Sequence, residues 1–201
     1  MVSVIMPTMW RSDRTEGLLE SLSNTPCVSE IIIIDNAKDN RPDVNFSDKV
    51  VLLEQDQNIF VNPAWNLGVS KSKEDYVCII NDDLTMDCES IFPIMKELMN
   101  HIPCIGIHSS SYSYEEDDVL MVRGHDIGRG WGCCIFLDKS RWVDIPEQLK
   151  IWFGDNWIAK TYKECASVVF PIKTEMSTTS NSKDLSDVIK EDIKQWGRLL
   201  P

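Results

Sequence analysis

The sequence has no long hydrophobic run, and this excludes one class of protein. A helix that crosses a bilayer needs about 18 consecutive apolar residues, and no run in these 201 residues approaches that length. The opening residues 2–6 are apolar, but they lack a basic flank and meet Pro7 at once, unlike a signal peptide. We therefore expect a cytoplasmic protein with no membrane span.

Histidines and paired cysteines are also scarce. The chain has 3 histidines and 7 cysteines, and no two cysteines form a CxxC pair. Without ligand spacing of that kind, a zinc site is not expected. An odd number of cysteines, most of them inside apolar stretches, indicates buried free thiols in a reducing compartment.

Positive charge is in short supply as well. The chain has 20 Lys and Arg against 32 Asp and Glu, which gives a formal net charge of −12. Such a surface repels phosphate backbones, and this argues against a nucleic-acid partner. A small phosphate-bearing substrate would for the same reason need a bridging cation or a local cluster of backbone N–H groups.

What the sequence does contain is an alternation of strand-like and helix-like segments. Short apolar, often β-branched runs predict strands at residues 2–6, 31–34, 50–53, 76–80 and 105–107. Apolar residues at helical spacing predict helices at residues 14–22, 62–70 and 90–99. This order is typical of an α/β fold with a mostly parallel sheet flanked by helices.

The second half of the chain is less regular. Its composition predicts a polar loop at residues 109–118, a glycine-rich segment at 123–132, a strand at 133–137 and a partly helical stretch at 151–162. A linker rich in Ser and Thr at residues 173–183 then leads to a final helix at 184–199. We therefore expect one domain over residues 1–172, followed by a linker and C-terminal helix over 173–201.

Two adjacent carboxylates, Asp82 and Asp83, follow the predicted strand at residues 76–80. Hard divalent cations such as Mg²⁺ and Mn²⁺ prefer carboxylate and phosphate oxygens. This carboxylate pair could hold one such ion, which would then bridge to a diphosphate that the acidic protein otherwise repels. The alternative is a solvated turn, because Asn and Asp favour turns.

Polar residues also follow the first two predicted strands. Pro7 and Thr8 close the first strand, and Asp35 and Asn36 close the second. In open α/β sheets, ligands bind beyond the carboxyl ends of the strands, so these residues should share one edge with the carboxylate pair. An acid at that edge can accept hydrogen bonds from a base or a ribose. The alternative for Asp35 is an ordinary strand cap.

Two asparagines, Asn58 and Asn66, lie around the helix that leads into the acidic strand. Amide side chains serve as neutral donors and acceptors near a ligand. The alternative interpretation is that they are turn and cap residues.

Aromatic residues and one further acid gather in the second half. Trp152 and Trp157 flank Asp155, which suits a sugar because apolar rings pack on C–H faces and an acid accepts a hydroxyl proton. A glycine-rich string that includes Trp131 and Gly132 could line the same pocket. The alternatives are a surface Asp that caps a helix and an ordinary loop.

Taken in order, these segments resemble the family 2 glycosyltransferases of the GT-A fold. Residues 2–8 are similar to the opening strand of that family, residues 31–36 to its second strand, and residues 58–83 to its Asn-rich helix and DxD-type metal motif. Residues 132–155 are similar to its acceptor-side strand and catalytic acid segment. The resemblance covers about residues 1–160. It departs from the family at Asn81, which replaces the first Asp of DxD, and at Gly154, where many relatives have Glu.

The resemblance implies a Rossmann-like GT-A domain with a nucleotide-binding half at about residues 1–108 and an acceptor-side half at about 109–172. It implies an inverting transfer from a nucleotide diphosphate-sugar, most simply a UDP-sugar, to a carbohydrate acceptor. The cofactor would be Mn²⁺ or Mg²⁺, bound by Asp83 and Asp82, with His125 as a possible further ligand. Asp155 would be the general base.

The remaining implied roles are binding roles. The nucleotide would be held by Pro7, Thr8, Asp35, Asn36, Asn58, Asn66 and Asp82. The sugar or acceptor would contact Trp131, Gly132, Trp152 and Trp157. The chain could also be one part of a longer multidomain protein.

Two other functions stay open at this point. One is a sugar nucleotidyltransferase, although the glycine-rich basic loop that those enzymes carry after the first strand is missing here: residues 8–13 include Arg11 but no glycine. The other is a non-catalytic module that binds a nucleotide-sugar or a carbohydrate.

Overall fold

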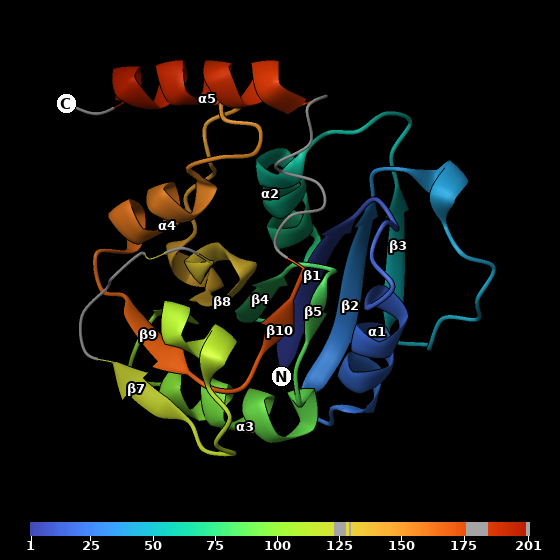
Figure 1. Cartoon of the computed structure of the whole chain (residues 1–201), viewed down its shortest axis with the longest axis vertical. Coiled ribbons are helices and arrows are strands. Elements are labelled where there is room, and N and C mark those ends of the chain that lie inside the picture. The colour runs from blue at the N-terminus through green and yellow to red at the C-terminus, as the bar shows by residue number, and fades with distance from the viewer. Residues whose placement is uncertain (123–127, 129, 176–184, 200–201) are drawn as a thin grey trace.

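Eight strands form one sheet in the computed structural model, which describes residues 1–122, 128, 130–175 and 185–199. Their order across the sheet is β3-β2-β1-β4-β8-β6-β9-β7 (Figure 1). The strands are β1 Val2–Thr8, β2 Val28–Asp35, β3 Val50–Glu54, β4 Tyr76–Ile80, β6 Cys104–Ile107, β7 Leu120–Val122, β8 Cys134–Asp138 and β9 Ala166–Val169. Two further short strands, β5 Leu84–Thr85 and β10 Lys173–Thr174, pair antiparallel beside it.

The direction of the strands determines which residues meet. β1 runs parallel to both β2 and β4, and β3 runs parallel to β2. β8 runs antiparallel to β4 and β6. The carboxyl ends of β1, β2 and β4 and the amino end of β8 therefore lie at one edge, which we call the carboxyl edge. The strand order reverses beside β1, and ligands of open α/β sheets bind at such a point.

Helices cover both faces of the sheet. They are α1 Thr15–Asn24, α2 Val61–Lys71, α3 Cys88–Leu98, α4 Gly154–Tyr162 and α5 Ser186–Leu199. Buried residues of α1 and α3 share one apolar cluster with Val4 and Met6 of β1. Buried residues of α2 and α4 share a second cluster with Ile5. Successive β1 side chains thus point to opposite faces, as strand geometry requires.

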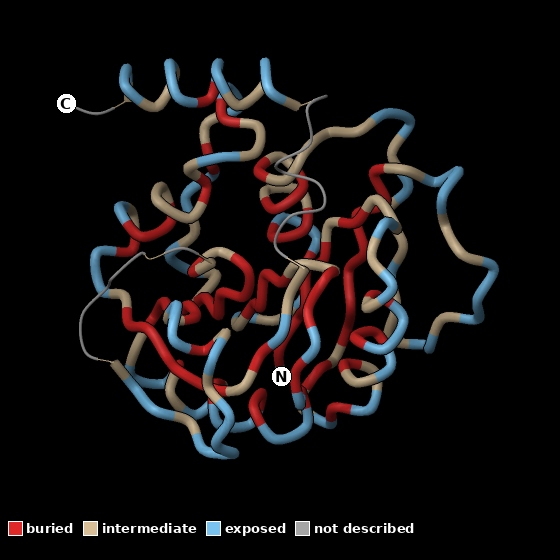
Figure 2. The backbone as a smooth tube through the Cα atoms, viewed as in Figure 1, coloured by how far each residue is buried: buried red, intermediate tan, exposed pale blue. Residues whose placement is uncertain are grey.

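The burial of β2 explains why its sequence has isoleucine at four successive positions. Ile31 and Ile33 belong to the first apolar cluster, and Ile32 and Ile34 belong to the second. A strand covered by helices on both faces needs apolar residues at every position. Burying each of these side chains contributes about 1.5–3 kcal/mol relative to exposure. Figure 2 shows the strands of this region as the most deeply buried part of the chain.

The structure confirms the predicted α/β class, a large and mostly parallel sheet flanked by helices. The strand predicted at residues 133–137 appears as β8, and the final helix appears as α5. The sequence does not predict strands β5, β7, β9 and β10, and the loop expected at 109–118 begins with a 3-10 helix, Ser109–Ser113. Across the described residues, no helix combines the length and the apolarity that a bilayer crossing demands.

Some sequence predictions lie outside the described residues. They include His125, part of the glycine-rich segment and most of the expected linker, which fall in residues 123–127, 129 and 176–184. The division of the chain at residue 172 stays a prediction.

Candidate active site at the carboxyl edge of the sheet

The first contact at this edge joins the ends of two neighbouring strands. The Thr8 hydroxyl at the end of β1 donates to Asp82 Oδ2, just beyond β4, at 2.5 Å. The same Thr8 oxygen accepts a hydrogen bond from the Trp10 backbone N–H at 2.8 Å. The Thr15 hydroxyl, in the first turn of α1, donates to the Asp82 carbonyl oxygen at 3.1 Å. Side chain and backbone of Asp82 are thus both held at the edge.

The Asp82 carboxyl group lies in an environment that disfavours its charge. Burial raises its pKa to about 6; the Thr8 hydrogen bond opposes this rise, and the neighbouring Asp83 charge adds to it. Desolvation and a like charge both favour the protonated form of an acid. A cation bound by these residues would offset both effects.

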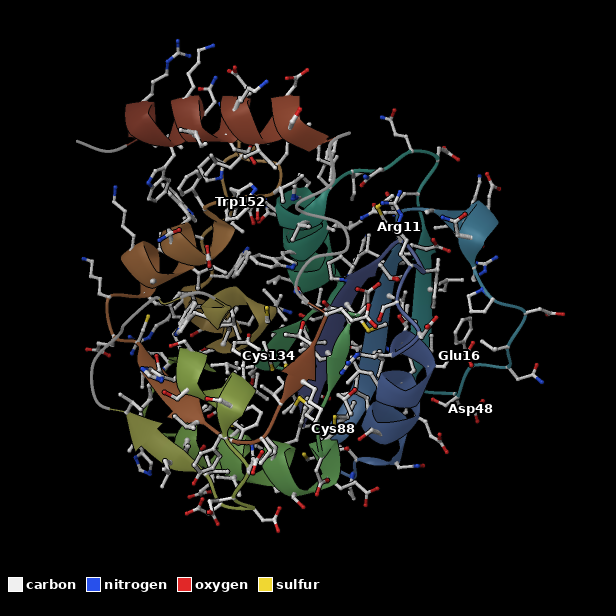
Figure 3. The ribbon with its side chains drawn as sticks, in the orientation of Figure 1. Arg11, Glu16, Asp48, Cys88, Cys134 and Trp152 are labelled. Atoms are coloured by element: carbon white, nitrogen blue, oxygen red, sulfur yellow. The ribbon has the colours of Figure 1, made fainter. Side chains whose placement is uncertain are left out.

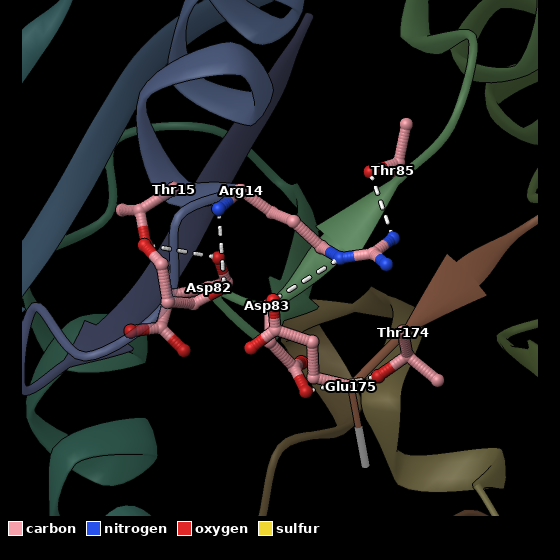
Figure 4. A network of polar contacts seen from close by, with 8 residues as sticks. Arg14, Thr15, Asp82, Asp83, Thr85, Thr174 and Glu175 are labelled. Atoms are coloured by element: carbon pink, nitrogen blue, oxygen red, sulfur yellow. Dashed lines mark hydrogen bonds and ion pairs between the residues drawn. The ribbon is translucent and has the colours of Figure 1, made fainter. Parts of the chain in front are cut away.

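Asp83 is also buried and is contacted from the C-terminal part of the chain. Its Oδ2 accepts a hydrogen bond from the Thr174 hydroxyl of β10 at 2.9 Å (Figure 4). Beside it, Arg14 Nε lies 3.4 Å from Glu175 Oε1, and Arg14 Nη1 donates to Thr85 Oγ1 at 3.1 Å. The carboxylate pair therefore lies within a polar network that includes the positively charged guanidinium group of Arg14.

The carboxylate pair could supply part, but not all, of the ligands of Mg²⁺ or Mn²⁺. Among the described residues, no three or more His, Cys, Asp or Glu side chains gather as a complete metal cage. Mg²⁺ usually binds through one or two carboxylates and keeps waters or substrate phosphates as its other ligands. Two adjacent carboxylates, half-buried Asp82 and buried Asp83, match that pattern, so they are the residues that would hold the ion.

A further acid of the edge, Asp35, is fully buried at the end of β2. Its Oδ1 accepts a hydrogen bond from the Ala37 backbone N–H at 3.0 Å. Its Oδ2 lies 3.4 Å from Arg41 Nη1, and the same guanidinium pairs with Glu54 at 2.5 Å. Asp35 is at the predicted place, but Arg41 would have to yield for a ribose or a base to reach Oδ2.

The two asparagines nearest to Asp35 organise a turn. Asn36 Oδ1 accepts from the Ile59 backbone N–H at 3.1 Å, and Asn58 Oδ1 accepts from the Phe60 backbone N–H at 2.8 Å. Phe60 has a φ of 68°, a strained conformation for an L-residue, immediately before α2. Asn36 thus lies at the carboxyl edge, as predicted, and Asn58 lies beside it; their contact with a nucleotide stays a prediction. Half-buried Pro7 lies beside Thr8 in β1.

Asn66 requires a correction. The sequence predicts a nucleotide contact for it, but both of its amide atoms bind the backbone of Ile145. Nδ2 donates to the Ile145 carbonyl oxygen at 2.9 Å, and Oδ1 accepts from the Ile145 N–H at 2.9 Å. These two bonds tie α2 to the loop before α4, so Asn66 has a role in the fold and we leave it out of the candidate site.

Asp155 approaches the same edge from the first turn of α4. Its Oδ1 accepts from the Asn156 backbone N–H at 2.9 Å, and burial raises the pKa of its carboxyl group. A Cβ atom added to Gly132 would lie 3.0 Å from Asp155 Cβ and 3.1 Å from its Oδ2. Glycine at position 132 therefore lets this acid pack directly against the segment that enters β8.

One backbone hydrogen bond joins the segment on which Asp155 packs to the strand end that carries the carboxylate pair. The Cys133 carbonyl oxygen accepts from the Asn81 N–H at 2.8 Å. Burial raises the pKa of the Cys133 thiol to about 12, and the charges of Asp83 and Asp155 both add to the rise. Cys133 thus lies near both Asp83 and Asp155, which the fold brings together from positions far apart in the sequence.

Gly154, the departure from the family pattern, has a packing reason. A Cβ at this position would lie 2.1 Å from Asn62 Oδ1 and 2.9 Å from the Trp65 ring. No larger residue fits while α2 keeps its position, because both neighbours are buried. Helix α4 therefore begins with glycine, after Phe153 at a φ of 67°.

Trp131 requires a second correction. The sequence predicts a sugar contact for it, but its side chain is 0% exposed and belongs to the second apolar cluster. Its indole packs against Gly106 of β6, where an added Cβ would lie 2.2 Å from the ring. Trp131 is a core residue. Trp152 is 41% exposed and lies next to α5 (Figure 3), and half-buried Trp157 donates from Nε1 to the Val143 carbonyl oxygen at 3.3 Å.

Several contributors to this edge cannot be found from the sequence. Thr15, Thr174 and Cys133 contact or flank the carboxylate pair, and Arg14 lies beside it. Thr174 carries no local signal, because it lies in a segment that has the composition of a linker. Arg14 also holds the N-cap position of α1, without a side-chain cap bond.

Comparisons with known proteins found a matching family model. Residues 3–164 match the family model described as Glycosyl transferase family 2. No curated protein matches the sequence.

Solved structures with a similar fold include S. aureus TarS. TarS 1-349 in complex with UDP-GlcNAc matches at a TM-score of 0.61 and 14% identity, over 94% of this chain and 64% of that one. The same fragment in complex with UDP matches at 0.56 and 13%, over 96% and 64%. A longer TarS structure matches at 0.59 and 13%, over 96% and 39%. This chain spans less than two thirds of the length of each of them.

Proposed function

Since this chain belongs to glycosyl transferase family 2, we propose that it transfers a sugar from a UDP-sugar to a hydroxyl group of a carbohydrate acceptor, with Mn²⁺ or Mg²⁺ as cofactor. The observation that carries the proposal is the meeting of three acids. Asp82 and Asp83 lie beyond β4, and Asp155 packs on Gly132, whose neighbour Cys133 is bonded to Asn81.

The carboxylate pair takes the diphosphate end of the donor. A divalent ion on Asp82 and Asp83 would neutralise the charge that builds on the departing diphosphate. A chain of net charge −12 would otherwise repel this group. The Thr8 hydroxyl keeps Asp82 Oδ2 turned toward the edge, and the base and ribose would lie along the ends of β1 and β2, near Asp35, Asn36 and Asn58.

Asp155 takes the acceptor end. Desolvation raises the pKa of its carboxyl group, which makes the carboxylate a stronger base toward an acceptor hydroxyl. As the hydroxyl oxygen forms a bond to the anomeric carbon, the proton passes to Asp155. The bond from that carbon to the diphosphate oxygen breaks on the opposite side, so the configuration inverts. Exposed Trp152, two residues before helix α4, offers an apolar face to the acceptor.

Two further observations support parts of the proposal. The similar TarS structures were solved with UDP-GlcNAc and with UDP, which supports a uridine nucleotide as the probe to test first. All seven cysteines are free thiols, which suits a cytoplasmic location.

The test is UDP release from a panel of UDP-sugars with Mn²⁺, in the presence of mixed glycan acceptors. The proposal expects UDP release by the wild-type chain, and a loss of about 100-fold or more in Asp155→Asn. The exposed Asp187→Asn on α5 serves as control and should retain the wild-type rate. Full activity of Asp155→Asn would contradict the assigned base, and no release with any donor would contradict the transferase.

A further inference from the structure

Helix α5 carries one buried residue within its described range Ser186–Leu199, and that residue is an acid. Asp192 is 0% exposed, while most of the helix around it is exposed (Figure 2). An isolated buried carboxylate is strongly destabilising unless hydrogen-bond donors surround it. A charged group at the buried position of a surface helix therefore calls for a specific partner.

The partner is the backbone of the loop that leads into α4. Asp192 Oδ1 accepts from the Lys150 N–H at 2.8 Å. Its Oδ2 accepts from the Ile151 N–H at 2.8 Å and from the Trp152 N–H at 2.9 Å. Three backbone bonds to one carboxylate are strong, charge-assisted contacts, and they fix the direction of three consecutive peptide groups.

The same loop is held from its other side by α2. The Lys150 carbonyl oxygen accepts from the Asn62 backbone N–H at 3.0 Å, and the Trp152 carbonyl oxygen accepts from Asn62 Nδ2 at 3.1 Å. The next residue, Phe153, stacks on Trp196 of α5 with ring centroids 5.2 Å apart and an interplanar angle of 3°. Donors and acceptors of the loop are thus tied to two separate helices.

This loop ends just before Asp155. Phe153 turns the chain through a left-handed conformation, and Asp155 follows two residues later in the first turn of α4. Asp155 has little free space beside Gly132, because a Cβ atom added to that glycine would lie 3.0 Å from Asp155 Cβ. Because a displacement of about 1 Å in a reacting group can cost about 100-fold in rate, the loop has to be fixed for Asp155 to meet an acceptor.

We propose that Asp192 of α5 is a positioning residue for transfer: it fixes the loop at residues 150–152 and thereby places Asp155 against Gly132. The inference rests on the proposed function, since Asp155 is the base of that function. It also gives the C-terminal helix a role in the chemistry, although its described residues supply no group to the carboxyl edge.

The experiment compares Asp192→Asn with Asp187→Asn, a matched change on the exposed side of the same helix. The first readout needs no substrate: the pKa of Asp155, followed by carboxyl carbon NMR in each variant. Because burial raises this pKa, a released loop should let it fall toward the ordinary value of about 3.9. The second readout is kcat and KM for UDP release from UDP-GlcNAc with Mn²⁺.

The expected result for Asp192→Asn is a lower Asp155 pKa, a kcat lower by about tenfold or more, and an unchanged KM for the donor. Asp187→Asn should match the wild type in all three. A folded Asp192→Asn chain with the wild-type Asp155 pKa and kcat would overturn the inference. If Asp192→Asn does not fold, Asp192→Glu, which keeps the charge but moves the carboxylate by one methylene away from the three N–H groups that it binds, gives the same test with the same expected and contrary results.

Results that contradict the proposed function can be distinguished from results that contradict the role of Asp192. A wild-type chain that releases no UDP, or an Asp155→Asn variant that releases it at full rate, would contradict the transferase or its base. The NMR titration would still decide whether Asp192 places Asp155.

Discussion

Thr8 donates its hydroxyl hydrogen to Asp82 across the ends of two neighbouring parallel strands, at 2.5 Å. The bond favours the ionised form of Asp82, whose pKa burial otherwise raises to about 6. A divalent cation binds the ionised form. The hydroxyl of Thr8 would therefore prepare the carboxylate pair for the proposed ion.

Replacing Thr8 by valine keeps the volume of the side chain and removes the donor. The Asp82 pKa should then rise, and uptake of Mn²⁺ in the presence of UDP should need a pH higher by about one unit. The loss of the free Mn²⁺ signal in electron paramagnetic resonance measures this midpoint. Thr8→Ser, which keeps the hydroxyl, should leave the midpoint near that of the wild type. Equal midpoints for all three proteins would refute the role of the bond.

The raised pKa of Asp82 also predicts how stability depends on pH in the absence of metal. Between about pH 4, the ordinary value, and about pH 6, its folded pKa, the native state binds more protons at Asp82 than the unfolded state does. The free energy of unfolding should therefore fall as pH rises through this window, by at most about 3 kcal/mol from this group. Urea unfolding at several pH values measures the slope.

Asp82→Asn should flatten that slope, because an amide does not titrate. Other acids that titrate on folding are common to both proteins, so the difference between the two curves isolates Asp82. A variant that keeps the full wild-type slope would show that Asp82 is not the group responsible.

Gly132→Ala tests the close approach of Asp155. The new methyl group would meet Asp155 Cβ at 3.0 Å, so the acid or the loop has to shift. We expect a loss of about 1–3 kcal/mol in stability from overpacking, together with a lower kcat for UDP release. Gly17→Ala is the matched control, because nothing lies within 4 Å of a Cβ at that helical position. It should retain the wild-type kcat and gain up to about 1 kcal/mol from helix propensity.

Alanine substitutions of Asn66 and Asn58 should have different effects: the first should lower stability, and the second should weaken UDP binding. Asn66→Ala breaks both bonds to Ile145 and leaves a backbone donor and acceptor without their partner, which should cost about 1–3 kcal/mol of unfolding free energy. Its affinity for UDP with Mn²⁺ should not change. Asn58→Ala should weaken UDP binding more than Asn66→Ala does. Denaturant unfolding and calorimetry on both variants provide the comparison, and a reversed order of affinities would contradict the assignment.

The first half of the fold could be predicted from the sequence because its signals are local. The run at residues 31–34 is β-branched at every position, as a strand buried on both faces requires, and Asp82 and Asp83 are adjacent in the chain. The alternation of strands and helices predicts the parallel arrangement. These features are sufficient to place Thr8, Asp35 and the carboxylate pair at one edge of the sheet.

What could not be predicted depends on pairs that are distant in sequence. From the sequence alone Trp131 is interpreted as a sugar contact, because its burial depends on Gly106 of β6, which lies 25 residues earlier. Asn66 resembles a ligand contact because its partner, Ile145, is 79 residues away. Asp192 resembles one of many surface acids, since the three N–H groups that it binds lie about 40 residues earlier. Neither composition nor periodicity carries such pairings.

The most direct test of metal-mediated donor binding is calorimetric titration of UDP into the chain with Mn²⁺, after chelation of the metal, and with Asp83→Ala. If the carboxylate pair holds the diphosphate through a divalent ion, heat of binding will appear with Mn²⁺ in the wild type. The affinity will be lower by about tenfold or more both without metal and in Asp83→Ala. Equal affinity in all three titrations would contradict the metal site at the end of β4.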